Sequence, residues 1–352
     1  MTAGRRRKTL CIGGMIYEGN GKFFRGYIKM KENEIVEVNT GSSPSEDYTG
    51  VVIPKFVNAH THIGDAIVEQ EPKGTLEALV APPNGLKFRM LREKTRTEKI
   101  AAMRKCAEEM GKTTACFVDF REEGVEGVAN LRKAIKGLKI QAKILGRPDN
   151  SARKEISTLL TECDGFAMSS ISDWDYSYLA TLSSMAKEKG KMFALHASER
   201  IREDIEKVLS LKPDFIVHMC RAEPDDFAAC AEKNVSVVVC PRSNLLFGSF
   251  PDVRKMLDEG VELMLGTDNA MFNVPSIFRE MEFLYKCRLK GYIEPERILR
   301  MAIDTPRKFF LGKKEFFERG TRAELIVLKL PFTEPAYQVV ARGGEHNVML
   351  SI

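Results

Sequence analysis

Short apolar runs alternate with amphipathic helical patterns through most of this chain. We predict buried strands at residues 51–60, 113–120, 138–146, 163–170, 192–197, 214–219, 235–240 and 261–266. Between most of these runs, apolar side chains recur every three or four residues, as they do along one face of an α-helix. Thr95 and Glu98 have the spacing of a capping box where one such helix begins. Eight alternations of strand and helix predict a (βα)₈ barrel, with an open doubly wound sheet as the alternative.

Both ends of the chain carry only short strand patterns. Residues 8–50 hold several of them around a Gly-Asn-Gly turn signal, and residues 323–330, 337–341 and 347–352 supply similar strands. Neither set is large enough to bury both faces of a sheet by itself. We therefore predict that the two termini form one small β-domain together.

The composition narrows the classes of function. The chain has 352 residues, a hydrophobic fraction of 43% and a formal charge of +5 from 54 basic and 49 acidic residues. This charge gives no reason to expect a nucleic-acid partner, and no apolar run reaches the length of a membrane span. Eight cysteines at irregular spacing, without a Cys-X-X-Cys pair or a secretory signal, predict reduced thiols and a cytoplasmic location.

Metal-binding side chains stand at the ends of several predicted strands. His60 and His62 end the first, and because residues i and i+2 share one face of a strand, both can reach a single metal ion. His196 and His218 end the fifth and sixth strands, and Asp268 ends the eighth. In a barrel these strand ends meet at one rim. Imidazole nitrogens and a carboxylate oxygen suit Zn²⁺ or Fe²⁺, so we predict a metal site there.

Glu199 follows His196 by three residues, just past the end of the same strand. There a carboxylate can take a proton from a metal-activated water and hand it to a ring nitrogen or a leaving group. The alternative is a favourable contact with a helix dipole. We favour the catalytic role because of the metal-binding residues around it.

Two connections are candidates for substrate contact. The long segment 64–92 is a candidate lid or substrate wall at the barrel mouth, or an inert surface excursion. Arg242, Ser243 and Asn244 follow the seventh strand and either hold the substrate or build the turn.

These motifs resemble the amidohydrolase superfamily, in its cytosine deaminase, adenosylhomocysteine deaminase and chlorohydrolase-like branch. They stand in the order of that family and span nearly the whole chain. The matching pieces are Pro54-X-Phe-Val-Asn-Ala-His60-X-His62, Gly111-X-Thr-Thr with Asp119, His196-X-X-Glu199, His218, Cys240-Pro-Arg-Ser-Asn244, Gly266-Thr-Asp268-Asn269, and Gly320 followed by Ala323-Glu-Leu-Ile-Val. The resemblance implies an α/β fold, with a distorted (βα)₈ TIM barrel at 51–317 and a small β-sandwich from 1–50 plus 318–352.

The resemblance also implies a role for each candidate residue. One divalent metal ion, Zn²⁺ or Fe²⁺, would be bound by His60, His62, His196 and Asp268. Glu199, His218 and Asp268 would be catalytic, and Asp119, Arg242, Ser243 and Asn244 are candidates for substrate binding. Binuclear relatives use a carboxylated lysine at the end of strand 4, and the corresponding residues 165–171 contain no lysine. One metal ion is therefore expected.

The resemblance favours a hydrolytic deaminase that acts on a small aminated heterocycle, such as a nucleobase, a nucleoside or a pterin, with metal-bound hydroxide as the nucleophile. The chain lacks the Trp-Leu helix motif expected after strand 1 of purine-nucleoside deaminases, which argues against that substrate class. The alternatives are hydrolysis of a cyclic amide or dechlorination on the same scaffold, and a non-catalytic binding protein. A small molecule is the expected partner, with homo-oligomer formation left open.

Overall fold

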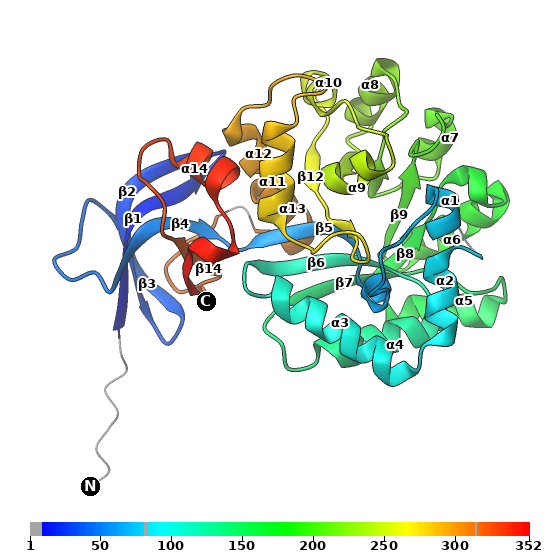
Figure 1. Ribbon diagram of the computed structural model, residues 1–352, viewed down its shortest axis with the longest axis horizontal. Coiled ribbons are helices and arrows are strands. Elements are labelled where there is room, and N and C mark those ends of the chain that lie inside the picture. Colours follow the sequence, from blue (N-terminus) through cyan, green and yellow to red (C-terminus); the bar gives the residue numbers. More distant parts are fainter. Residues whose placement is uncertain (1–8, 81–83, 314) are drawn as a thin grey trace, which may run out of the picture.

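The computed structural model of the chain describes residues 9–80, 84–313 and 315–352. Nine strands form a curled sheet in the order β12-β11-β10-β9-β8-β7-β6-β5-β13, and every neighbouring pair is parallel (Figure 1). Their bounds are β5 Phe56–His62, β6 Thr114–Arg121, β7 Gln141–Gly146, β8 Gly165–Met168, β9 Met192–Ala197, β10 Phe215–His218, β11 Ser236–Val239, β12 Leu263–Leu265 and β13 Asp268–Asn269. The predicted distorted barrel is confirmed.

The barrel closes where its first and last strands meet. Thr267 N donates a hydrogen bond of 3.0 Å to His60 O, and β13 then pairs with β5. Gly266 allows this close approach, because a Cβ atom there would lie 2.7 Å from His60 Cβ. The closure therefore brings Asp268 beside the two histidines of β5.

Helices pack against the outside of the barrel, as the alternating pattern predicted (Figure 1). The capping box at the start of α3 is confirmed, since the Thr95 and Glu98 side chains each bond to the other residue's backbone N–H. The helices that follow the barrel strands are α3 Arg96–Met110, α4 Gly124–Ile135, α5 Arg153–Glu162, α6 Tyr176–Glu188, α7 Ile205–Ser210, α8 Pro224–Glu232, α9 Pro241–Leu246, α10 Val253–Asp258, α11 Ile277–Lys286, α12 Pro295–Ala302 and α13 Asp304–Leu311.

Two buried apolar layers stabilise this arrangement. Strand residues such as Val57, Val217 and Met264 form a compact cluster that α13 closes with Phe310. The opposite strand faces join the helices in a larger cluster, to which Met103 of α3 and Leu131 of α4 belong. Because strands buried on both faces are apolar throughout, they could be recognised in the sequence as apolar runs.

The remaining strands form a second, six-stranded sheet in the order β15-β14-β4-β1-β2-β3. Their bounds are β1 Thr9–Gly19, β2 Lys22–Lys31, β3 Glu34–Thr40, β4 Tyr48–Pro54, β14 Leu325–Leu328 and β15 Val348–Ser351. β4 pairs with β1 on one side and with β14 on the other, so it joins the two ends of the chain edge to edge (Figure 1). The prediction that strands from the two termini associate is confirmed, and these described strands belong to one sheet.

Two details of the predicted elements need correction. Residues 337–341 are not a strand but lie in helix α14, Pro335–Arg342, whose proline occupies the first turn and whose buried Ala336, Val339 and Val340 have helical spacing. The predicted strand 51–60 is two strands, β4 and β5, and Lys55 separates them. The expected boundary between residues 50 and 51 therefore falls inside β4, and the division into two domains stays a prediction.

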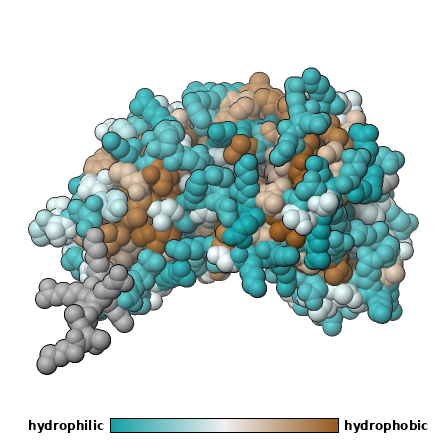
Figure 2. Space-filling model, turned by 60° about the horizontal axis from the view of Figure 1, so that its bottom comes forward, coloured by the Kyte–Doolittle hydropathy of each residue, from teal (hydrophilic) through white to brown (hydrophobic). Residues whose placement is uncertain are grey.

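The long segment 64–92 carries helical structure above the barrel mouth. Its described residues include most of the 3₁₀ helix Ile63–Ile67 and two short helices, α1 Leu76–Val80 and α2 Leu86–Glu93, while residues 81–83 lie outside the described part of the chain. On the face of the molecule shown in Figure 2, hydrophilic side chains cover most of the surface and hydrophobic ones gather in separate groups. Among the described helices, none combines the length and the apolar character needed to cross a bilayer.

Candidate active site

Four buried side chains meet at the carboxyl ends of the barrel strands. His60 Nε2 lies 3.3 Å from His196 Nε2 and 3.3 Å from Asp268 Oδ1, and His62 Nε2 lies 3.8 Å from the same carboxylate oxygen. Candidate ligand atoms of His60, His62 and His196 lie within 4.8 Å of one another, as do those of His60, His218 and Asp268. The structure thus brings together every residue for which the sequence predicted metal binding.

The backbone is irregular at several of the residues whose side chains point into the site. The pairing of β5 with β6 shifts register between Asn58 and Thr61, as at a β-bulge, and beyond this point His60 and His62 face the site. His218 and Asp268 have φ angles of 84° and 59°, values that non-glycine residues seldom adopt. Such strain is typical of functional sites, where the surrounding structure holds it in place.

The His62 ring is oriented by its own hydrogen bonds. Its Nδ1 atom forms a hydrogen bond of 3.1 Å with Phe120 O and lies 2.9 Å from the carboxylate oxygen Glu122 Oε1, and neither oxygen can donate. Nδ1 therefore carries the proton, and Nε2 presents its lone pair to the other ligands. Glu122 is itself held by Lys87 Nζ at 2.5 Å and by Arg121 Nη2 at 2.7 Å.

The protonation states fit a divalent cation. Burial lowers the pKa of His60 and His196, and burial together with the charge of Lys87 lowers the pKa of His62 to about 3, so the imidazoles are neutral at pH 7. Burial alone would raise the pKa of Asp268, but the hydrogen bond to His60 holds it well below its usual value. Three neutral imidazoles and one carboxylate match the ligands of Zn²⁺ or Fe²⁺.

Glu199 and His218 lie next to this cluster. Glu199 Oε1 is 3.6 Å from His218 Nε2, and burial raises the pKa of the Glu199 carboxyl group. Asn244 Nδ2 donates to His218 Nδ1 at 2.9 Å, which places the proton of a neutral His218 ring on Nε2, facing Glu199. A carboxyl group and an imidazole N–H thus stand side by side at the edge of the metal site.

The other candidates for substrate binding make contacts within the protein. Ser243 Oγ donates to Asp268 Oδ2 at 2.5 Å, so Ser243 and Asn244 each support one residue of the cluster. Arg242 pairs with buried Glu280 at 2.7 Å and also donates to Val274 O. Asp119 is fully buried, where its carboxylate accepts from Thr61 Oγ1 and Ile63 N. Substrate binding by these four candidates stays a prediction.

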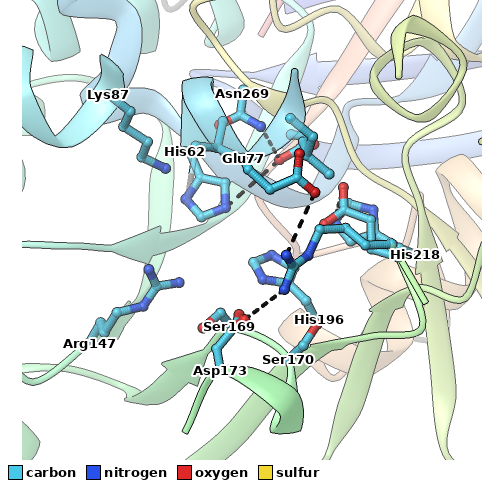
Figure 3. A pocket seen from close by; sticks show the side chains of 15 residues that line it. His62, Glu77, Lys87, Arg147, Ser169, Ser170, Asp173, His196, His218 and Asn269 are labelled. Carbon is cyan, nitrogen blue, oxygen red and sulfur yellow. Dashed lines mark hydrogen bonds and ion pairs between the residues drawn. The ribbon is translucent and has the colours of Figure 1, made fainter. Parts of the chain in front are cut away.

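A polar pocket opens directly onto the cluster (Figure 3). About 580 Å³ of space lies within it, the open solvent at its mouth included. Its walls include five residues that the motifs did not point to: Glu77, Lys87, Arg147, Ser169 and Ser170. Arg147 and the two serines directly follow strands β7 and β8, so a search for polar residues after every strand could have found them. Glu77 and Lys87 come from the long segment 64–92 and had no such signal.

Comparison with known proteins agrees with this geometry. The family model described as the amidohydrolase family matches residues 51–351. A putative aminohydrolase of Methanothermobacter thermautotrophicus is 32% identical and covers 96% of this chain and 97% of its own length. A 5-methylthioadenosine/S-adenosylhomocysteine deaminase of Caldicellulosiruptor saccharolyticus is 21% identical over 95% of this chain and 89% of its own length.

A solved structure shares the fold at lower sequence identity. The crystal structure of an adenosine deaminase from Xanthomonas campestris with bound zinc has a TM-score of 0.76, at 18% identity, over 96% of this chain and 90% of that one. Members of the matching family typically bind a divalent metal, and the histidine–aspartate cluster provides a candidate place for one. The family match over most of the sequence and the relative at 32% identity lead to one conclusion: this chain belongs to the amidohydrolase family and is a hydrolase of carbon–nitrogen bonds.

Proposed function

We propose that this protein is a mononuclear metal-dependent deaminase that replaces the amino group of a small heterocycle with oxygen and releases ammonia. The observation that carries the proposal is the convergence of His60, His62, His196 and Asp268 beside the carboxyl group of Glu199. These four ligands would hold Zn²⁺ or Fe²⁺. When bound, the ion would lower the pKa of water and so supply a nucleophile at neutral pH.

Three side chains would move or hold protons during the reaction. Burial raises the pKa of Glu199 and so favours its protonated carboxyl group, which gives its proton to the ring nitrogen next to the carbon under attack. Asp268 takes a proton from the attacking water. His218 Nε2–H donates to the oxygen that becomes negatively charged.

Collapse of the tetrahedral intermediate completes the reaction. The bond between carbon and the exocyclic nitrogen breaks as the leaving amine takes up the proton that Asp268 received. The remaining proton of the new hydroxyl group passes to the Glu199 carboxylate, which restores the protonated carboxyl group. Water and the aminated ring are thereby converted to ammonia and the oxo form of the ring. Relatives described as 5-methylthioadenosine/S-adenosylhomocysteine deaminases support this class of reaction, while the absent Trp-Leu motif keeps the substrate open beyond nucleosides.

Ammonia release tests the proposal directly. Protein loaded separately with Zn²⁺, Fe²⁺ and Mn²⁺ would be offered aminated nucleobases, nucleosides and pterins. We expect ammonia from one substrate class and its loss on chelation. In Glu199→Gln, kcat should fall by about 10²–10⁴-fold while the metal stays bound. Glu206→Gln, an exposed carboxylate of helix α7, is the matched control and should leave activity unchanged.

Two outcomes would contradict the proposal. Metal-loaded protein that hydrolyses cyclic amides but releases no ammonia from any aminated ring would assign it to the other reaction of this scaffold. Full activity in Glu199→Gln would remove the carboxyl group from the mechanism.

A further inference from the structure

Arg147 is a buried cation without a partner in the active-site pocket. It directly follows strand β7, and its side chain is only 8% exposed. Throughout residues 9–80, 84–313 and 315–352, no group forms a hydrogen bond or an ion pair with its guanidinium, and its buried Nε atom has no partner. In Figure 3 the guanidinium points into the cavity on the side where Lys87 and His62 lie.

The nearby carboxylates are already engaged by other cations. Glu122 lies 2.5 Å from Lys87 Nζ and 2.7 Å from Arg121 Nη2. In the turn that follows Ser170, Asp173 accepts a hydrogen bond of 2.8 Å from Arg200.

Two further acids do not offset the charge of Arg147. Asp119 is fully buried and ion-pairs with Arg121. Burial raises the pKa of Asp65 to about 8, so this acid is mostly neutral at pH 7. Since arginine is not deprotonated in proteins, Arg147 leaves an excess positive charge at this wall.

Hydroxyl groups stand beside this charge. Ser169 and Ser170 follow strand β8, the neighbour of β7, and line the same pocket. Ser169 Oγ accepts a hydrogen bond of 2.7 Å from Trp174 Nε1, which leaves its own proton free to donate into the pocket. A guanidinium fork next to hydroxyl donors suits a carboxylate or a phosphate, which it can bind through two parallel hydrogen bonds.

We infer that this wall, formed by Arg147, Ser169 and Ser170, binds an anionic substituent of the substrate while the aminated ring lies at the metal site. The inference rests on the proposed deaminase function and adds a substrate class to it: heterocycles that carry a carboxylate or a phosphate. Arg147 is then a residue that determines specificity, since it binds a part of the substrate that does not react.

Matched pairs of compounds test this inference. Pterin and pterin-6-carboxylate differ by a carboxylate, and adenosine and adenosine 5′-monophosphate differ by a phosphate, so the two pairs distinguish the two anions. We expect the anionic member of at least one pair to have the higher kcat/KM. Arg147→Gln should lower the kcat/KM of that anionic member at least tenfold more than that of its neutral counterpart, and Arg147→Lys should restore part of the difference. Arg153→Gln, on the exposed start of α5, is the control and should leave the kcat/KM of both the anionic and the neutral member unchanged.

Binding and stability measurements separate this inference from the proposed function. If no compound releases ammonia, the proposed function fails, and the affinities of the same four compounds for metal-loaded protein still decide whether Arg147 selects anions. Because the guanidinium has no partner to lose, Arg147→Met should raise the midpoint of thermal unfolding in the absence of ligand. The inference would be overturned by equal losses for both members of each pair in Arg147→Gln, or by no preference for either anion in the wild-type protein. A lower unfolding midpoint in Arg147→Met would also overturn it, because it would indicate a structural role.

Discussion

Replacing Glu122 with glutamine should weaken metal binding although Glu122 is not itself a ligand. The carboxylate holds three donors at once, namely His62 Nδ1 at 2.9 Å, Lys87 Nζ at 2.5 Å and Arg121 Nη2 at 2.7 Å. A glutamine has one accepting oxygen, and its NH₂ group would face at least one of these donors. The His62 ring would lose part of its support, and two cations would lose their shared counter-charge.

The expected size of this effect follows from the contacts. Loss of the carboxylate that orients a metal-binding histidine typically lowers metal affinity 10–100-fold, or about 1.4–2.8 kcal/mol. Removal of one partner from a buried ion pair also costs about 3–5 kcal/mol of folding stability. Both quantities are measurable: the Zn²⁺ affinity by competition with a chelator, and the free energy of unfolding by denaturant titration of the apoprotein.

A second variant separates the two effects. Glu122→Gln combined with Lys87→Met removes one unpaired cation, so it should recover part of the folding stability but not the metal affinity, because His62 remains unsupported. Glu126→Gln, an exposed carboxylate on α4, is the control and should change neither quantity. A folded Glu122→Gln protein that binds Zn²⁺ as tightly as the wild type would refute the reasoning.

Three further predictions concern neighbouring parts of the site. Asn244→Ala removes the donor to His218 Nδ1 and should lower kcat roughly tenfold while metal content, measured by elemental analysis, is unchanged. Gly266→Ala places a Cβ atom 2.7 Å from His60 Cβ and should cost about 1–3 kcal/mol of stability and weaken metal binding; unchanged unfolding would contradict the close approach. Since burial raises the pKa of Glu199, kcat/KM should fall as the pH rises through this raised value, and the fall should be absent from the residual activity of Glu199→Gln.

Much of the barrel could be predicted because its strands are buried on both faces and therefore stand out as apolar runs. The strands that carry His196 and His218 lie within a residue of the predicted ranges at both ends. The prediction of a strand at residues 337–341 was wrong. Val339 and Val340 are typical of strands, but Pro335 and the helical spacing of the buried residues place this segment in α14.

The candidate metal ligands could be predicted from strand ends, but their surroundings could not. The positive φ angles of His218 and Asp268 depend on the packing around these residues, and no local sequence pattern predicts such angles. Lys87 reaches the site from a helix in a long connection, where apolar periodicity carries no information about which way a polar side chain points. Arg242 bonds to Glu280, a partner 38 positions further along the chain that only the tertiary fold brings close.

The central claim is that one metal ion and the Glu199 carboxyl group together make this protein a deaminase. The most direct test is to titrate the metal-free protein with Zn²⁺ and to follow ammonia release from its best substrate. Activity should rise linearly and stop at one equivalent of metal per chain, with almost none in Glu199→Gln at any metal concentration. An end point at two equivalents, or ammonia release that does not depend on metal, would contradict the account.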